Sequence, residues 1–104
     1  GGIEKGEDFK KAAARELMEE IGYRPQKLKK VIEFYPTPGI CAEVMYVYLA
    51  ENLKPQTAEA DEDEDIETFE VSLNQIGRMI KTGKIKDAKT IISYFYLRNP
   101  QAFA

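Results

Sequence analysis

The apolar positions near the start of the chain repeat at helical spacing. Phe9, Ala13, Leu17 and Ile21 recur every four residues and form one apolar stripe, and the residues between them are mostly good helix formers. Gly22 stands where a left-handed residue would end such a helix. The pattern therefore predicts a helix in the second half of residues 1–23, ending at Gly22.

Two later stretches have the composition of strands. Residues 28–35 mix β-branched and aromatic side chains, and residues 41–50 are apolar on nearly both faces. The second stretch should therefore lie centrally in a sheet, under helices. Residues 36–39 (Pro-Thr-Pro-Gly) separate the two strands, and residues 24–27 should form a short turn after the helix. Residues 51–65 read as a polar connection, and the alternation over residues 66–71 predicts a third strand.

The chain closes with two predicted helices. Ser72 and Gln75 have the spacing of a capping box, so a helix should run over residues 73–82 and stop at Gly83. Asp87 can cap a last helix over residues 88–97, whose apolar residues surround much of its girth. We expect that helix to be largely buried against the sheet or a partner subunit. Together these elements predict a layered α/β domain of the α+β type.

Composition narrows the function classes. The 104 residues fit one domain, and the net charge of −3 with a pI near 5.1 offers no attraction to nucleic acid or to an acidic membrane surface. Cys41 is the sole cysteine, which excludes an internal disulfide and suits a reducing, cytoplasmic compartment. The chain has no histidine, which excludes catalytic triads and histidine-metal sites.

Three carboxylates crowd one side of the first predicted helix. Glu16, Glu19 and Glu20 lie within about one turn, although like charges at this spacing destabilise a helix by roughly 0.2–0.5 kcal/mol per pair. A hard divalent cation would use such oxygens, and Arg15, one turn before Glu19, can hold that carboxylate in place. From these glutamates alone, a solvated acidic face on a surface helix is an equally good interpretation.

The full spacing of residues 1–23 resembles the signature of the Nudix hydrolases. That signature is Gly-x5-Glu-x7-Arg-Glu-U-x-Glu-Glu-x-Gly-U, where U is aliphatic, and this chain departs from it only in the aromatic Tyr23; the matching residues are Gly1, Glu7, Arg15, Glu16, Leu17, Glu19, Glu20 and Gly22. The resemblance implies that Glu16, Glu19 and Glu20 bind Mg²⁺ or Mn²⁺, while Gly1, Glu7 and Gly22 support the loop and the helix.

The same resemblance implies an α/β/α sandwich with a mixed sheet, in which several strands precede this motif. Residues 1–104 would then be the C-terminal portion of a Nudix domain, without its N-terminal strands and without an upstream carbonyl that helps to bind metal. Unpaired strand edges would be exposed, so we expect the isolated chain to fold poorly.

Three further stretches resemble the ADP-ribose pyrophosphatase branch of the family. The turn with Pro38 and Gly39 would border the substrate, and Glu43 would face the site from the following strand. The acidic run 61–65 resembles a mobile loop that supplies the general base, for which Glu62 is the first candidate and Glu64 the second. Residues 84–90 resemble the entry to the branch's C-terminal helix. Taken on their own, a Pro-Gly turn and a run of acids more often mean a rigid turn and a solvated loop.

These resemblances predict a metal-dependent hydrolase that splits ADP-ribose into AMP and ribose 5-phosphate. Arg15 would be a catalytic residue together with Glu62 and Glu64, and the full-length protein would be a homodimer. Other substrates stay open, namely a nucleotide-sugar, a dinucleoside polyphosphate or an oxidised nucleoside triphosphate. A non-catalytic ligand sensor or structural module is a further alternative, but such modules often lose the glutamates that this chain keeps.

Overall fold

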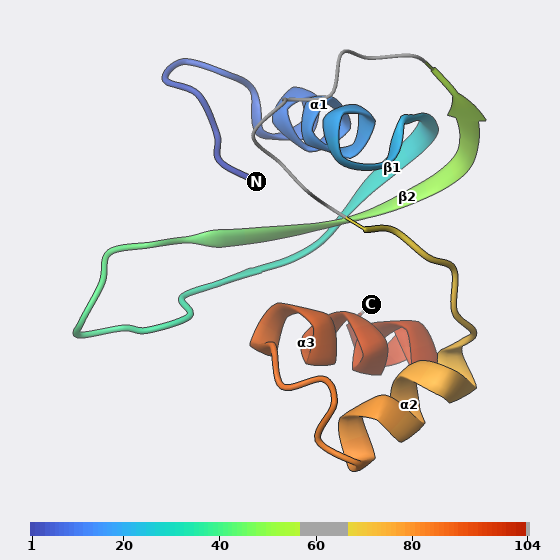
Figure 1. Cartoon of the computed structure of the whole chain (residues 1–104). Coiled ribbons are helices and arrows are strands. Elements are labelled where there is room, and N and C mark those ends of the chain that lie inside the picture. The colour runs from blue at the N-terminus through green and yellow to red at the C-terminus, as the bar shows by residue number, and fades with distance from the viewer. Residues whose placement is uncertain (57–66, 104) are drawn as a thin grey trace. The chain divides into compact units, whose positions relative to one another are not determined.

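The structure of the protein is a computed structural model that describes residues 1–56 and 67–103. Its elements in chain order are α1 (Phe9–Ile21), β1 (Tyr23–Phe34), β2 (Met45–Pro55), α2 (Leu73–Lys81), α3 (Ala88–Arg98) and a 3₁₀ helix η1 (Pro100–Phe103) (Figure 1). Contacts divide the chain into two units. The first contains residues 1–30 and 48–68, and the second contains residues 31–47 and 69–104.

Helix α1 begins and ends on the residues that its sequence favours. The Asp8 side chain accepts a hydrogen bond from the Lys11 amide at 3.1 Å and caps the N-terminus. Gly22 has a φ of 73° and donates its N–H to the Met18 carbonyl, which confirms the predicted left-handed end. Of the stripe, Ala13, Leu17 and Ile21 are half-buried, whereas Phe9 is 45% exposed.

The predicted turn at residues 24–27 was wrong, because β1 starts at Tyr23 directly after the helix. The positive φ of Gly22 reverses the chain at one residue, so no longer turn is needed. Gly22 also accepts a hydrogen bond from the Gln56 amide at 2.9 Å, which joins the residue after β2 to the end of α1.

Strand β2 lies further along the chain than its apolar residues predict. It runs from Met45 to Pro55 instead of over residues 41–50, because the Ile40 and Cys41 amides both hydrogen-bond the Thr37 carbonyl and prolong the turn. At its other end, β2 extends through residues 51–55, three of which are polar, since the backbone hydrogen bonds of a sheet do not require apolar side chains.

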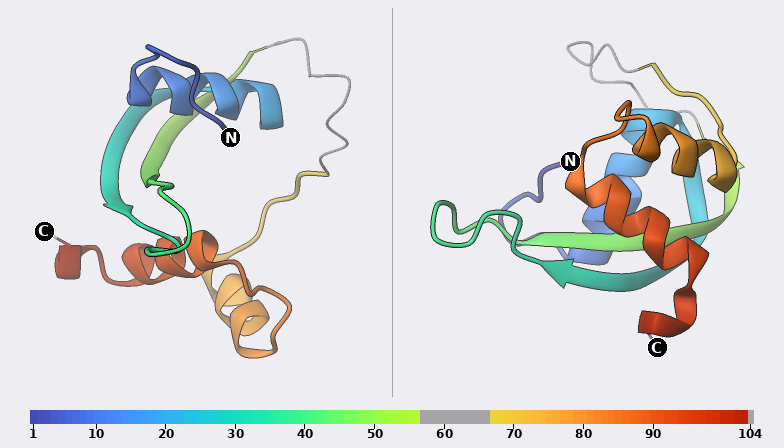
Figure 2. Two further views of the ribbon diagram at one scale, coloured as in Figure 1. Left: turned by 90° about the vertical axis from the view of Figure 1, so that its left-hand side faces the viewer. Right: turned by 90° about the horizontal axis from the view of Figure 1, so that it is seen from below.

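Within the described ranges, β1 and β2 form a two-stranded antiparallel sheet, which Figure 2 shows from two sides. The central position predicted for β2 was therefore wrong for this part of the chain. Residues 45–50 are half-buried and residues 51–55 are exposed. Asn52 has a φ of 54°, a left-handed conformation within the strand.

The third predicted strand was also wrong where it can be examined. Residues 67–71 have no regular secondary structure, and Ile66 lies outside the described ranges. Phe69 is 71% exposed and Val71 is 38% exposed. An alternating sequence forms a strand only when a neighbouring strand accepts its backbone groups, and the described sheet ends at β1 and β2.

The two closing helices are confirmed. In α2, Ser72 accepts a hydrogen bond from the Gln75 amide and Gln75 returns one to the Ser72 amide, which completes the capping box. In α3, Asp87 accepts a hydrogen bond from the Thr90 amide. Gly77 faces α3 closely, because a Cβ added there would lie 2.6 Å from the Tyr94 hydroxyl.

Only part of α3 is buried within the described residues, so its burial against the sheet or a partner subunit stays a prediction. Tyr96 is buried at 7% exposure and stacks edge-to-face on Phe103, but Phe95 is 58% exposed and Leu97 is 37% exposed. In the first unit, Ala12 is the corresponding buried residue, at 3%. A core this small agrees with the expected poor folding of the isolated chain, which stays a prediction. No helix in the described ranges has the length and apolar character to cross a membrane.

Candidate metal-binding site

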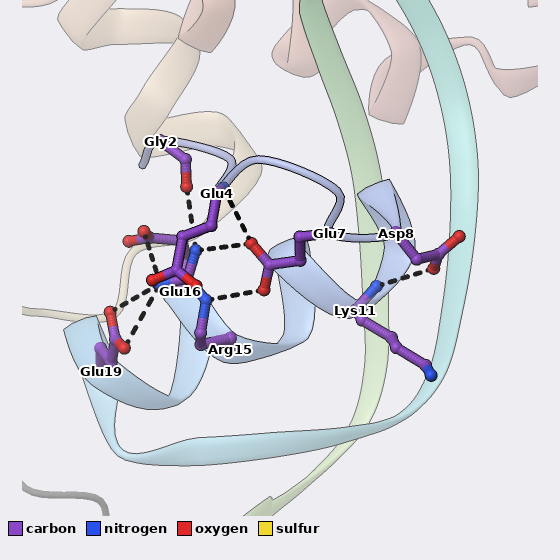
Figure 3. Close-up of polar contacts among 8 residues, drawn as sticks. All are labelled: Gly2, Glu4, Glu7, Asp8, Lys11, Arg15, Glu16 and Glu19. Atoms are coloured by element: carbon purple, nitrogen blue, oxygen red, sulfur yellow. Dashed lines mark hydrogen bonds and ion pairs between the residues drawn. The ribbon is translucent and has the colours of Figure 1, made fainter.

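Arg15 is the centre of a polar network that joins α1 to the loop before it (Figure 3). Its Nε donates to Oε2 of Glu7 at 2.8 Å, and its Nη2 donates to Oε1 of Glu7 at 3.0 Å. The Nη2 group also donates to the Gly2 carbonyl at 3.0 Å. Two parallel bonds to one carboxylate form the strongest and most directional pairing available to arginine. This side of Arg15 therefore fixes the loop to the helix.

The remaining terminal nitrogen of Arg15 contacts the acidic face of the same helix. Its Nη1 lies 3.0 Å from Oε1 of Glu16 and 3.3 and 3.2 Å from the two oxygens of Glu19. The predicted contact with Glu19 is thus present, and it is the longest of the three ion pairs that Arg15 makes with glutamates. One nitrogen serves two carboxylates that would otherwise repel each other.

The network is partly shielded from water. Glu7 and Glu16 are 16% and 17% exposed, Arg15 is 24% exposed, and Glu19 is 33% exposed. The hydrogen bonds from Arg15, followed by the one from the Glu4 amide, hold the pKa of Glu7 below its usual value. The same bond to Glu7, with smaller contributions from Glu19 and Glu16, raises the pKa of Arg15. Arg15 and Glu7 are therefore charged throughout the neutral range.

Glu20 completes the acidic face. Its side chain is 37% exposed, and its Oε1 lies 3.9 Å from the Gly1 nitrogen. Gly1 also lies against Glu16, since a Cβ added to Gly1 would overlap the Glu16 carboxylate. The loop can pass this close to the glutamates because residue 1 has no side chain. The three glutamates therefore do not project into open solvent but share one half-buried face with the loop.

The donor chemistry of this face fits a hard divalent cation. Glu16, Glu19 and Glu20 offer only carboxylate oxygens, the ligands that Mg²⁺ and Mn²⁺ prefer. Within residues 1–56 and 67–103, however, no three acidic, histidine or cysteine side chains gather as a ready metal cluster. The Nη1 nitrogen of Arg15 contacts both Glu16 and Glu19 on this face, at 3.0 and 3.2 Å.

The other predicted site residues lie elsewhere in the chain. Pro38, Gly39 and Glu43 are exposed on the β1–β2 connection, where Gly39 has a φ of 89°. Glu43 precedes β2 instead of lying on it, so its predicted position on the strand was wrong, because the turn extends past Cys41. Glu62 and Glu64, the two predicted bases, lie outside the described residues.

Sequence reasoning missed part of the network. Glu7 was expected to cap or support the loop; it supports the loop through the Glu4 amide and Arg15, whereas Asp8 caps the helix. The Gly2 carbonyl was not anticipated as a partner of Arg15. The Asp8-x-x-Lys11 spacing could have identified the cap. No local pattern could have identified the Gly2 carbonyl, which is 13 residues from Arg15.

Known proteins share this architecture. The NUDIX domain model matches residues 1–94. The chain is 40% identical over 98% of its length to an ADP-ribose pyrophosphatase of Bacillus subtilis, and 38% identical over 98% to a methanol dehydrogenase activator of Bacillus methanolicus. It is 41% identical over 82% of its length to a GDP-mannose pyrophosphatase of Citrobacter koseri.

A solved structure of an ADP compounds hydrolase matches 92% of the chain with a TM-score of 0.81 and 26% identity, and the chain covers 52% of that structure. The chain covers 56% of each Bacillus relative and 46% of the Citrobacter one. The domain match, the motif on α1 and the shared α/β fold agree with one another, and this chain belongs to the Nudix family.

Proposed function

We propose that the chain is the C-terminal portion of a Nudix pyrophosphohydrolase whose domain includes strands upstream of Gly1. The proposed substrate is a nucleoside diphosphate linked to a second group, with ADP-ribose as the first choice. The observation that carries the proposal is the half-buried row of Glu16, Glu19 and Glu20 beside a loop anchored by Arg15. In the proposed reaction, water adds to one phosphorus and the bond to the bridging oxygen breaks, which releases AMP and ribose 5-phosphate.

The three glutamates are the proposed ligands of Mg²⁺ or Mn²⁺. A metal ion held there would screen the diphosphate charge and lower the pKa of the attacking water. Arg15 holds two of the ligands and the loop in register, so it is a positioning residue as the structure stands. Glu62, or Glu64 in its place, is the proposed base that accepts the proton of that water.

Substrate recognition is proposed for the β1–β2 connection. A ligand can reach this connection because its residues Pro38, Gly39 and Glu43 are exposed. The full-length protein is also proposed to be a homodimer and to be located in the cytoplasm. The single, exposed Cys41 is compatible with a reducing compartment.

A nucleotide-sugar is the second candidate substrate. It is favoured by the 41% identity with a GDP-mannose pyrophosphatase, which is as high as the identity with the ADP-ribose enzyme but covers less of the chain. Both substrates contain a diphosphate, so the same metal face would serve either. The side chains that contact the base and the sugar would decide between them.

The test is hydrolysis of ADP-ribose and GDP-mannose by the full-length protein in Mg²⁺, with a dinucleoside polyphosphate and an oxidised nucleoside triphosphate for comparison. Glu20→Gln should lower turnover by at least about a hundredfold, because it removes a charged ligand while keeping the shape. Glu70→Gln is the matched control, since Glu70 is an exposed glutamate before α2. Turnover near the wild-type rate in Glu20→Gln would refute the metal role.

A further inference from the structure

Arg15 uses its two sides differently. The Nε and Nη2 atoms bind Glu7 in parallel and also reach the Gly2 carbonyl, all within 3.0 Å. The Nη1 atom is shared by Glu16 and Glu19, and its contacts with Glu19 are the longest in the network, at 3.2 and 3.3 Å. Shorter, paired bonds resist displacement better than longer, shared ones. One side of the guanidinium is therefore anchored and the other is the weaker point of attachment.

The exposure of the partners sets Glu19 apart from the other two glutamates. Glu7 and Glu16 are 16% and 17% exposed, whereas Glu19 is 33% exposed. Glu19 is therefore the glutamate partner of Arg15 that water reaches most easily. Figure 3 shows Glu7 and Glu19 on opposite sides of the Arg15 guanidinium.

The Nη1 nitrogen lies 3.0 Å from a carboxylate oxygen of Glu16 and 3.2 Å from one of Glu19. The nitrogen carries positive charge into the space between Glu16 and Glu19, which a divalent ion would need if it bound both. Two cations cannot share that space without strong repulsion at this separation. A divalent ion that binds both glutamates must therefore displace Nη1 from Glu16, from Glu19 or from both.

The geometry points to Arg15 as an internal counter-ion that a divalent metal replaces. This inference rests on the proposed function, since it requires Glu16, Glu19 and Glu20 to bind the ion. The charge of Nη1 offsets the charges of Glu16 and Glu19, which would otherwise repel each other. When metal binds, Nη1 leaves at least one of these glutamates while Nε and Nη2 stay on Glu7 and the Gly2 carbonyl. The loop thus keeps its position through the exchange.

Nitrogen-15 spectra of the Arg15 side chain in the full-length protein test the inference directly. On titration with Mg²⁺, the Nη1 protons should exchange with water at least about tenfold faster, because a charge-assisted hydrogen bond is lost. The Nε proton should keep its chemical shift and its exchange rate. Unchanged Nη1 protons at saturating Mg²⁺, or loss of the Nε bond as well, would overturn the inference.

Backbone amides of residues 16–20 serve as the internal check on metal binding in the same titration. If they shift while Nη1 is unchanged, the proposed function stands and the exchange does not. If they do not shift with either Mg²⁺ or Mn²⁺, both proposals fail.

A variant gives an independent measurement. Arg15→Gln removes the competing charge, so its dissociation constant for Mn²⁺, measured by calorimetry, should fall by about tenfold. Lys11→Gln is the matched control because it removes one positive charge from the same helix outside the network, and its constant should match the wild type. Weaker Mn²⁺ binding by a folded Arg15→Gln protein would show that Arg15 orients the ligands without competing for their place, which overturns the inference. The wild-type spectra decide the question if that variant does not fold.

Discussion

The polar contacts of α1 and those of α2 and α3 differ in how far along the chain they reach. At the ends of α2 and α3, side-chain hydrogen bonds join residues two to four positions apart, as in the pairs Ser72–Gln75 and Asp87–Lys89. Around α1, Arg15 also reaches eight residues back to Glu7 and 13 residues back to Gly2. Local bonds define where a helix starts and stops, whereas the longer ones hold a loop against a helix face.

This difference separates structural polar groups from candidate functional ones. The Asp87–Lys89 pair is exposed, with side chains 43% and 57% accessible, and such pairs contribute little to stability. The Arg15 network is more shielded and includes charges that no fold requires, since Glu16 and Glu19 repel each other without it. A cluster of like charges does not stabilise a helix, but it can bind a cation.

Among the variants that compare these two regions, substitution of Arg15 should produce the largest effect. In the full-length protein, Arg15→Lys should lower diphosphate hydrolysis by about 10–100-fold, because lysine cannot reproduce the paired bonds to Glu7 and also reach Glu16. Lys89→Ala is the control from the other region and should leave turnover unchanged. Steady-state kinetics at saturating Mg²⁺ provide the measurement, and equal turnover in Arg15→Lys and wild type would remove the distinction between the two regions.

The next largest effect should come from the close approach of α2 and α3. Gly77→Ala places a Cβ only 2.6 Å from the Tyr94 hydroxyl oxygen, so the Tyr94 side chain must shift. We expect a loss of about 1–3 kcal/mol in the free energy of unfolding, partly offset by the better helix propensity of alanine. Urea unfolding measures the loss, and adding Tyr94→Phe should recover part of it. A Gly77→Ala protein more stable than the wild type would show that the contact between Gly77 and Tyr94 adapts without cost.

Removal of the caps should have a smaller effect, similar in both regions. Asp8→Ala and Ser72→Ala each delete one side-chain acceptor at a helix N-terminus, so each should cost about 1 kcal/mol in unfolding free energy. Asp8→Asn, which keeps an acceptor, should cost much less. Only Asp8→Ala should also weaken metal binding, since Asp8 adjoins the loop that carries Glu7. Equal metal affinity in the two alanine variants would show that the loop is held by Arg15 alone.

The smallest effect should be the pH dependence of stability that Glu7 contributes. Its pKa in the folded protein lies below the unfolded value of about 4.3, so its stabilising effect is complete above that pH and is lost as the pH falls through the folded pKa. The melting temperatures of wild type and Glu7→Gln should therefore differ at pH 7 and converge under acidic conditions. A difference that persists unchanged at low pH would exclude an origin in the charge of Glu7.

Local chemistry allowed much of the structure to be predicted from the sequence. The helix ending at Gly22, the capping box at Ser72 and the cap at Asp87 depend on residues no more than four positions apart, and all three are confirmed. The candidate metal ligands Glu16, Glu19 and Glu20 were identified from the resemblance of residues 1–23 to the Nudix signature, since their spacing alone left a solvated acidic face equally good.

The incorrect predictions concern features that depend on distant partners. Strand β2 extends through residues 51–55, and residues 67–71 are not a strand, whatever their alternation. Hydrophobic pattern alone cannot decide either case, because a strand is defined by the backbone of its neighbour.

The sequence by itself determined where α1 ends, where α2 and α3 begin, which carboxylates share a face and which family the chain resembles, since each follows from short, fixed spacings. Tertiary structure alone decided that Arg15 joins Glu7 and Gly2 on one side and Glu16 and Glu19 on the other. The physical reason is that a side chain selects its partners by distance in space, and the fold of the loop brings Gly2 to a helix residue 13 positions away.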